Sequence, residues 1–86
     1  MISLIYTHTF IKQLKKLDNK FYEEVLEKIK LFENPLNHKR LKVHKLHGRL
    51  SDKYAFWINR KDRIIFQYGL KNEVYLLAID DHDGYR

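Results

Sequence analysis

The sequence has no cysteine, one proline, three glycines and no long apolar run. The absence of cysteine excludes disulfide bonds, zinc fingers and thiol catalysis. No stretch approaches the roughly 18 apolar residues that a membrane-spanning helix needs. Because proline and glycine are scarce and 44% of the residues are apolar, the composition is typical of a globular chain and not of a disordered one.

The length of 86 residues fits one domain and leaves no room for a second core, so we predict a single domain over residues 1–86. The first six residues contain neither a basic region nor a long apolar segment, which is unlike a signal peptide. We therefore expect a cytoplasmic protein.

The charge of the chain is distributed unevenly. Seventeen Lys and Arg residues face eleven Asp and Glu residues, which gives a net charge of +6. Nine of the basic residues and only two of the acidic ones lie within residues 35–63, called the basic segment below. A strongly basic stretch in an otherwise neutral chain indicates a polyanionic partner.

The first half of the chain predicts one strand and two helices. A short β-rich run forms the strand at residues 2–6, and Thr7 is suited to cap the helix that follows. Asp18 offers the next N-cap, and a second helix runs to about Glu33 before Pro35 ends it. Apolar side chains recur at helical spacing in both segments: Phe10, Ile11, Leu14 and Leu17, then Phe21, Val25, Ile29 and Phe32.

The second half predicts three strands after a polar connection at residues 36–49. The strands are expected at residues 54–59, 63–68 and 74–80, and the four-residue links between them are typical of hairpins. The fold class is therefore α+β with the order β-α-α-β-β-β. We expect two N-terminal helices packed on one face of a mostly antiparallel four-stranded sheet.

The basic segment carries imidazole and aromatic side chains between its cations. Such a mixture is suited to a nucleic-acid strand, because cations neutralise phosphates while aromatic rings stack on bases. A solvated loop that keeps a small protein soluble is the structural alternative. The concentration of the basic residues in a third of the chain favours the polyanionic partner. The interleaved side chains are His44, His47, Tyr54, Phe56 and Trp57.

Two further side chains are suited to phosphate chemistry. Arg63 opens an otherwise apolar strand, and a guanidinium on a rigid sheet is a planar, permanently charged clamp for phosphate. His82 directly follows the last predicted strand, and imidazole both takes and gives protons near neutral pH. The structural alternatives are a charge that caps a strand edge for Arg63 and a frayed polar tail for His82.

The sequence predicts neither a metal site nor a cofactor. His44 and His47 lie three residues apart but have no cysteine or second histidine pair to complete a zinc site. Asp80, Asp81 and Asp83 raise a metal-dependent nuclease as an alternative. Hard cations need carboxylates that converge from several elements, however, and these three lie in one tail.

Three stretches together carry a resemblance: residues 44–51 (HKLHGRLS), residues 54–68 with Arg63 inside them, and the closing residues 82–85 (HDGY). The chain resembles the RelE/ParE superfamily of bacterial toxins and is most similar to its RelE, YoeB and YafQ ribonuclease branch. The resemblance implies the toxin of a type II toxin–antitoxin system. It would be a ribosome-dependent, metal-independent mRNA endoribonuclease that inhibits translation. A cognate antitoxin would silence it, docking on apolar side chains of the helix pair.

The resemblance also assigns roles to single residues. Arg63 falls on the family's phosphate-contacting arginine, and His82 falls on the tail histidine of YafQ-like members. His44 lies at a position where YafQ-like members have a histidine and YoeB-like members have a glutamate. Tyr85 resembles the tail tyrosine of RelE-like members. Cleaving RNA without metal requires a base, a cation for the phosphorane and an acid. Our hypothesis is His44 as base, Arg63 as clamp and His82 as acid, and Tyr85 orients the phosphate or stacks on a base. RNA binding is assigned to Lys42, Lys45, His47, Arg49, Lys53, Arg60 and Lys61.

Two other functions remain open at this point. A ParE-like toxin of the same fold would act on DNA gyrase, although such members generally lack a histidine-containing tail. A basic RNA-binding module without catalysis is the second alternative. The chain also departs from the YafQ pattern at Trp57, where that pattern has a second histidine.

Overall fold

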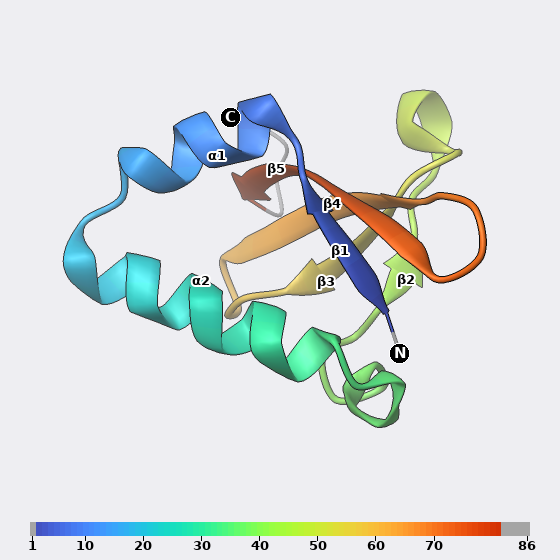
Figure 1. Ribbon diagram of the computed structural model, residues 1–86, viewed down its shortest axis with the longest axis horizontal. Coiled ribbons are helices and arrows are strands. Elements are labelled where there is room, and N and C mark those ends of the chain that lie inside the picture. The colour runs from blue at the N-terminus through green and yellow to red at the C-terminus, as the bar shows by residue number, and fades with distance from the viewer. Residues whose placement is uncertain (1, 82–86) are drawn as a thin grey trace.

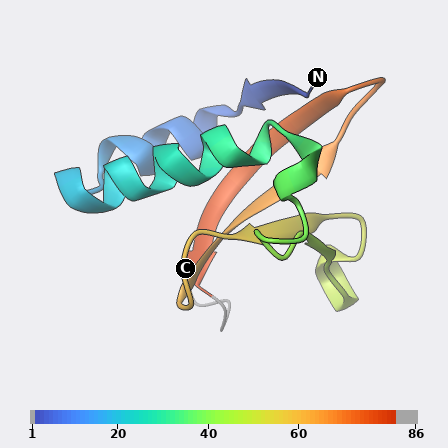
Figure 2. The ribbon, with the colours of Figure 1, turned by 90° about the horizontal axis from the view of Figure 1, so that it is seen from below.

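The computed structural model describes residues 2–81 and places two helices on one face of a five-stranded sheet (Figures 1 and 2). The strand order is β1-β5-β4-β3-β2, with β1 parallel to β5 and the other neighbours antiparallel. The elements are, in chain order, β1 (Ser3–Tyr6), α1 (His8–Lys15), α2 (Asn19–Phe32), the 3-10 helix η1 (Pro35–Asn37), β2 (His44–Lys45), the 3-10 helix η2 (Gly48–Leu50), β3 (Tyr54–Trp57), β4 (Asp62–Tyr68) and β5 (Glu73–Asp81).

The predicted α+β class, with both helices on one face of a mostly antiparallel sheet, is confirmed. The predicted number of strands is wrong, because the sheet formed within residues 2–81 has five strands and not four. The additional strand is β2, which lies inside the connection expected at residues 36–49 and pairs with β3. A two-residue strand is too short to produce an alternating pattern in a sequence. It is held in place by the buried Leu41 and Leu46, which precede and follow it.

Both predicted helix starts are confirmed. The Thr7 and Asp18 side chains accept hydrogen bonds from the backbone N–H groups three residues later, at 3.3 and 2.9 Å. Beyond the end of β1, the Gln13 side chain of α1 replaces the missing strand partner of β5. Ile79 N donates to Gln13 Oε1 at 2.7 Å, and Gln13 Nε2 donates to Ile79 O at 3.2 Å. The carboxyl end of β5 is thus fixed to α1.

The main core lies between the helices and the sheet, and aromatic rings form its centre. Phe32 of α2 stacks on Phe56 of β3 with ring centroids 4.3 Å apart, and lies edge-on to Phe66 of β4 at 4.9 Å. His38 also stacks on Phe32 at 4.6 Å and donates from Nε2 to the Phe32 carbonyl at 2.9 Å. His38, to which no functional role was assigned, therefore supports the core.

Replacing Phe32 with alanine is expected to lower the free energy of unfolding by about 3–5 kcal/mol, because it removes a fully buried ring and leaves a cavity. Urea unfolding measures this change. Leu36→Ala is the matched control, since the Leu36 side chain in η1 is 87% exposed and its loss should change stability by less than about 0.5 kcal/mol. Equal losses at both positions would contradict this description of the core.

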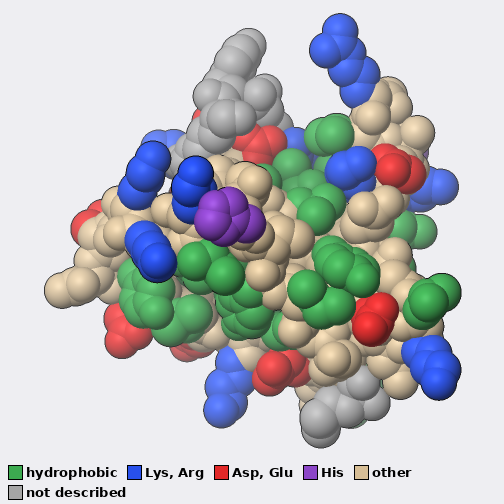
Figure 3. Space-filling model, turned by 45° about the horizontal axis from the view of Figure 1, so that its top comes forward, with side chains coloured by type: hydrophobic (Ala, Val, Ile, Leu, Met, Phe, Trp, Pro, Cys, Tyr) green, Lys and Arg blue, Asp and Glu red, His purple; other side chains and the backbone are tan. Residues whose placement is uncertain are grey.

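Several large apolar side chains remain exposed on β1, α1 and α2. Tyr6, Ile11 and Tyr22, called the helix-side patch below, are between 37% and 38% exposed. Burial raises the pKa of Tyr6, and the charges of Glu33 and Tyr22 add to the rise. Figure 3 shows a face on which apolar side chains gather among charged side chains of both signs. Among residues 2–81, no helix is long and apolar enough to cross a membrane.

Candidate functional site

The face of the sheet that carries no helices holds a second, smaller apolar cluster. Leu46, Ala55 and Ile65 are buried there, and Leu50 and Leu77 pack against them. Leu77 is the extra residue of a β-bulge in β5, because its neighbours Ala78 and Leu76 pair with the consecutive residues Ile65 and Phe66 of β4. The bulge brings Leu77 into this cluster. The segment between β2 and β3 thereby folds over part of this face, and among residues 2–81 a groove opens beside it.

Cross-strand register places His44 and Arg63 on this face. His44 lies opposite Ala55, and Trp57, two residues further along β3, lies opposite Arg63. Residues two apart on a strand share a face, so His44, Trp57 and Arg63 point to the same side. The backbones of His44 and Arg63 are two strands apart and offset by two residues along the strand direction. The distance between them is therefore roughly 12 Å. Ala55, which pairs with His44 on the strand between them, is buried.

A groove with a volume of about 430 Å³ opens at this place. Both predicted phosphate-chemistry side chains of the basic segment, His44 and Arg63, line it. The remaining lining residues are Lys45, Leu46, His47 and Leu50. The groove therefore combines two imidazoles, one guanidinium and one ammonium over a small apolar base.

The local hydrogen bonding of His44 leaves one ring nitrogen for a ligand. His44 Nδ1 lies 2.7 Å from the Lys42 carbonyl oxygen. A carbonyl oxygen only accepts, so Nδ1 carries the hydrogen and the neutral ring has its lone pair on Nε2. Since His44 is exposed at the groove, Nε2 is suited to take a proton from a bound hydroxyl.

Arg63 is held by an acidic partner on the neighbouring strand. Its Nη2 donates to Asp80 Oδ2 at 3.4 Å, and the two side chains are only 14% and 11% exposed. Asp80 Oδ1 accepts from the backbone N–H of Asp81 at 3.0 Å, so both carboxylate oxygens have partners. Arg63 Nε is buried and has no hydrogen-bond partner within residues 2–81. The N–H donors left for a ligand in the groove are therefore the two of Nη1 and the second one of Nη2.

The other predicted RNA-binding side chains lie on two sides of Arg63. Lys45 and His47 line the groove, and Arg49 is exposed in η2. Arg60 and Lys61 are exposed in the turn between β3 and β4, immediately before the strand that carries Arg63. A polyanion that lies along the groove would meet positive charge at both ends.

Lys53 and Lys42 differ from these cations because each has a partner in the fold. Lys53 Nζ lies 3.0 Å from Asp52 Oδ1, and this hydrogen bond lowers the pKa of the Asp52 carboxyl. Gln67 Nε2 donates to the other Asp52 oxygen at 3.3 Å. The Lys42 ammonium lies 5.2 Å from the centre of the Trp57 ring, which is a cation–π distance.

Two of the predicted site residues, His82 and Tyr85, lie outside the described residues. Within residues 2–81 no group of three or more His, Cys, Asp or Glu side chains is arranged to hold a metal ion. Asp80, considered above as a metal ligand, is instead the partner of Arg63.

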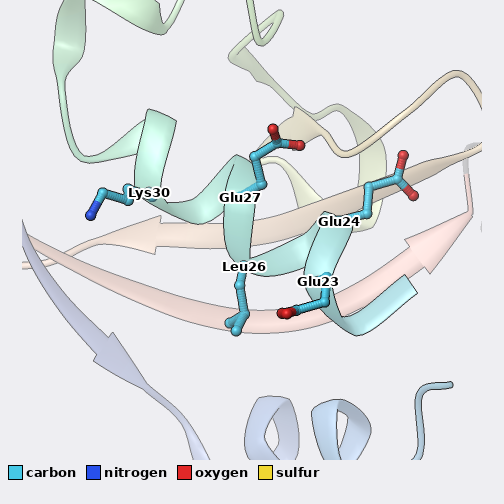
Figure 4. A pocket seen from close by; sticks show the side chains of 5 residues that line it. All are labelled: Glu23, Glu24, Leu26, Glu27 and Lys30. Carbon is cyan, nitrogen blue, oxygen red and sulfur yellow. The ribbon is translucent and has the colours of Figure 1, made fainter. Parts of the chain in front are cut away.

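A second hollow of about 460 Å³ lies along α2 (Figure 4). In Figure 4, Glu23 and Leu26 point to one side of the helix while Glu24 and Glu27 point to the other. Glu24 also accepts a hydrogen bond from Asn59 Nδ2 at 3.1 Å. Because these side chains diverge and three of them are carboxylates, the hollow is not suited to phosphate chemistry.

Sequence reasoning missed two interactions of the site: the pairing of Asp80 with Arg63, and the contacts that Lys42 makes within the fold. Asp80 was grouped with the acidic tail, yet it pairs with Arg63 because the two residues lie opposite each other in β4 and β5. Lys42 was treated as one free cation among several, although its carbonyl and its ammonium are both engaged. The hairpin register between residues 63 and 80 was a usable signal for the first interaction. No sequence signal pointed to the second.

The fold is shared with solved structures of bacterial and archaeal toxins. A chain of the toxin–antitoxin complex RelBE2 from Mycobacterium tuberculosis superposes with a TM-score of 0.71 at 18% identity, covering 94% of this chain and 98% of that one. A chain of the archaeal RelE–RelB complex from Pyrococcus horikoshii gives 0.70 at 21% identity, with 93% of each chain covered. A mutant of YafQ from Escherichia coli gives 0.62 at 14% identity, with 96% of each chain covered.

These likenesses confirm the fold expected from the resemblance to RelE, YoeB and YafQ toxins. At identities of 14–21% they establish the fold alone. No family model matches the chain, and no curated protein matches it in sequence.

Proposed function

We propose that this chain, which has the fold of the RelE, YoeB and YafQ toxins, is the toxin of a type II toxin–antitoxin system. It cleaves mRNA on the ribosome without a metal ion and so inhibits translation. The observation that carries the proposal is the groove, which is lined by the imidazole of His44 in β2 and the guanidinium of Arg63 in β4, 19 residues further along the sequence. The fold likeness supports it.

In the proposed reaction His44 Nε2 takes the proton of the 2′-hydroxyl, and the 2′-oxygen attacks the adjacent phosphorus. The Nη groups of Arg63 stabilise the negative charge of the pentacoordinate phosphorane. His82 gives a proton to the leaving 5′-oxygen, and Tyr85 orients the phosphate or stacks on a base. The P–O5′ bond breaks as the P–O2′ bond forms, so the products carry a 2′,3′-cyclic phosphate and a 5′-hydroxyl.

The RNA strand is held by Lys45, His47, Arg49, Arg60 and Lys61 on either side of Arg63, with Lys53 beside them. We expect Arg60→Gln combined with Lys61→Gln to lower the slope of log affinity against log salt by about 1.4, since each contact to single-stranded RNA contributes about 0.7. Fluorescence anisotropy with an RNA oligonucleotide at several salt concentrations measures this slope. Lys15→Gln with Lys16→Gln, an exposed pair outside the basic segment, is the matched control and should leave it unchanged.

The partner that silences the toxin is a cognate antitoxin. Its docking surface is the helix-side patch of Tyr6, Ile11 and Tyr22, because exposed apolar side chains on neighbouring elements suit an amphipathic segment.

The test is cleavage of an mRNA on translating ribosomes by the purified chain, with the cut sites mapped by primer extension. We expect cuts in translated mRNA, 5′-hydroxyl product ends and no change in rate with a chelator of transition metals that leaves ribosomal Mg²⁺ in place. Binding without cleavage would contradict the proposal and favour an RNA-binding module. DNA damage on expression, with translation unaffected, would favour action on DNA gyrase.

A further inference from the structure

We infer that Lys42, held over Trp57, is a positioning residue that fixes the ring tautomer of His44 through its own backbone carbonyl. The inference rests on the proposed function, in which His44 takes a proton at Nε2. It gives Lys42 a role other than the phosphate contact expected from the basic segment. Three contacts carry it, one from each part of the Lys42 residue.

The backbone of Lys42 adopts a conformation that side chains rarely take. Its φ angle is 58°, in the left-handed region that favours glycine. The Lys42 N–H donates to the Lys39 carbonyl at 3.1 Å, which closes the turn before β2. In this conformation the Lys42 carbonyl oxygen lies 2.7 Å from His44 Nδ1. The residue with the unfavourable backbone conformation, Lys42, is thus the same residue whose carbonyl sets the tautomer of His44.

The side chain of Lys42 ties this turn to β3. Its ammonium lies 5.2 Å from the centre of the Trp57 ring, and Trp57 N donates to the carbonyl of Leu41 at 2.8 Å. Trp57 lies opposite Arg63 in the sheet register. The turn that orients His44 is therefore attached to β3 through the Leu41 carbonyl and through the Lys42 side chain, and β3 is the strand next to Arg63.

The consequence is chemical, because only one neutral tautomer of His44 can act as the base. With the hydrogen on Nδ1, the lone pair of Nε2 is available to the 2′-hydroxyl. With the hydrogen on Nε2, the ring would present a donor to the groove and could not accept that proton. Loosening the Lys42 turn should therefore slow the chemical step without weakening RNA binding to the same extent.

The experiment measures the His44 tautomer by NMR in protein labelled with ¹⁵N-histidine, using His44→Gln to assign its signals. Lys42→Met removes the ammonium and keeps most of the stem, while Lys42→Arg keeps the cation–π contact. Lys71→Met is the matched control, because Lys71 is an exposed lysine with a φ angle of 55° in the β4–β5 turn. Single-turnover cleavage and RNA affinity are measured on the same variants.

We expect His44 to carry its hydrogen on Nδ1 in the wild-type protein. In Lys42→Met, the ratio of the Nε2–H to the Nδ1–H tautomer should rise about fivefold, the factor of one net hydrogen bond. The cleavage rate should fall in proportion to the loss of the Nδ1–H tautomer, with RNA affinity within twofold. Lys42→Arg should restore both, and Lys71→Met should change neither. Adding Lys42→Met to Trp57→Leu should have no further effect.

An unchanged tautomer ratio in Lys42→Met, or the same change in Lys71→Met, would overturn the inference. The NMR measurement does not depend on catalysis. A chain that cleaves no RNA but shows the expected tautomer shift would therefore contradict the proposed function and leave the positioning by Lys42 standing.

Discussion

Arg63→Gln is expected to lower the single-turnover rate of mRNA cleavage by about 10²–10³, with a much smaller loss of RNA affinity. In the proposed reaction the guanidinium acts mainly on the phosphorane, where negative charge builds up, and the removal of one such donor typically costs this much. In the proposed complex the RNA strand also contacts several other cations, which lie on both sides of the groove. Cleavage of ribosome-bound mRNA at saturating enzyme measures the rate separately from affinity.

Loss of folding is the main confounding effect at this position, and the structure supplies the control. Arg63→Gln leaves the largely buried Asp80 carboxylate without its ion-pair partner, which costs up to about 3–5 kcal/mol of stability. Asp80→Asn in the same chain removes that charge, so the double variant should regain stability in urea unfolding. It should not regain activity. Activity that returned with stability would show that Arg63 serves the fold and not the reaction. Lys20→Gln, an exposed change on α2, should alter neither quantity.

The fold was predictable because its elements are long enough to have a period. The caps at Thr7 and Asp18 and the apolar stripe of α2 are local features, and the structure confirms them. The strands β4 and β5 are seven and nine residues long, and their apolar runs stand out in the sequence. The two residues of β2 have no period, and their strand exists only because Leu41 and Leu46 are buried around it.

The candidate site was predictable as a set of residue types and not as an arrangement. Charge counting located the basic segment, the chemistry of guanidinium singled out Arg63, and the resemblance to YafQ- and YoeB-like members singled out His44. Their meeting depends on register across three strands, which a single sequence does not determine. The partners Asp80 and Trp57 depend on the same register and on the bulge at Leu77. A shift of one residue in β4 would have turned Arg63 toward the main core.

His44→Gln is expected to lower the cleavage rate by about 10²–10⁴, the usual contribution of a positioned general base. His44 is exposed, so its replacement leaves no cavity and the unfolding free energy should stay within about 0.5 kcal/mol of the wild-type value. His8→Gln is the matched control, since His8 is an exposed histidine at the start of α1. An RNA with a 2′-deoxy nucleotide at the scissile position should resist the wild-type protein, because the proton that His44 takes and the attacking oxygen are both missing.

A sulfur leaving group separates the base from the acid. When the scissile 5′-oxygen is replaced by sulfur, the leaving group departs as a thiolate and needs no proton from an acid. This substrate should restore most of the activity that His82→Gln loses, and should leave His44→Gln as slow as before. If the sulfur substrate restored the activity of His44→Gln and not that of His82→Gln, His44 would be the acid and His82 the base. Rescue of neither, with both variants still folded, would mean that the two imidazoles do not share one phosphate, and the proposed proton transfers would be wrong.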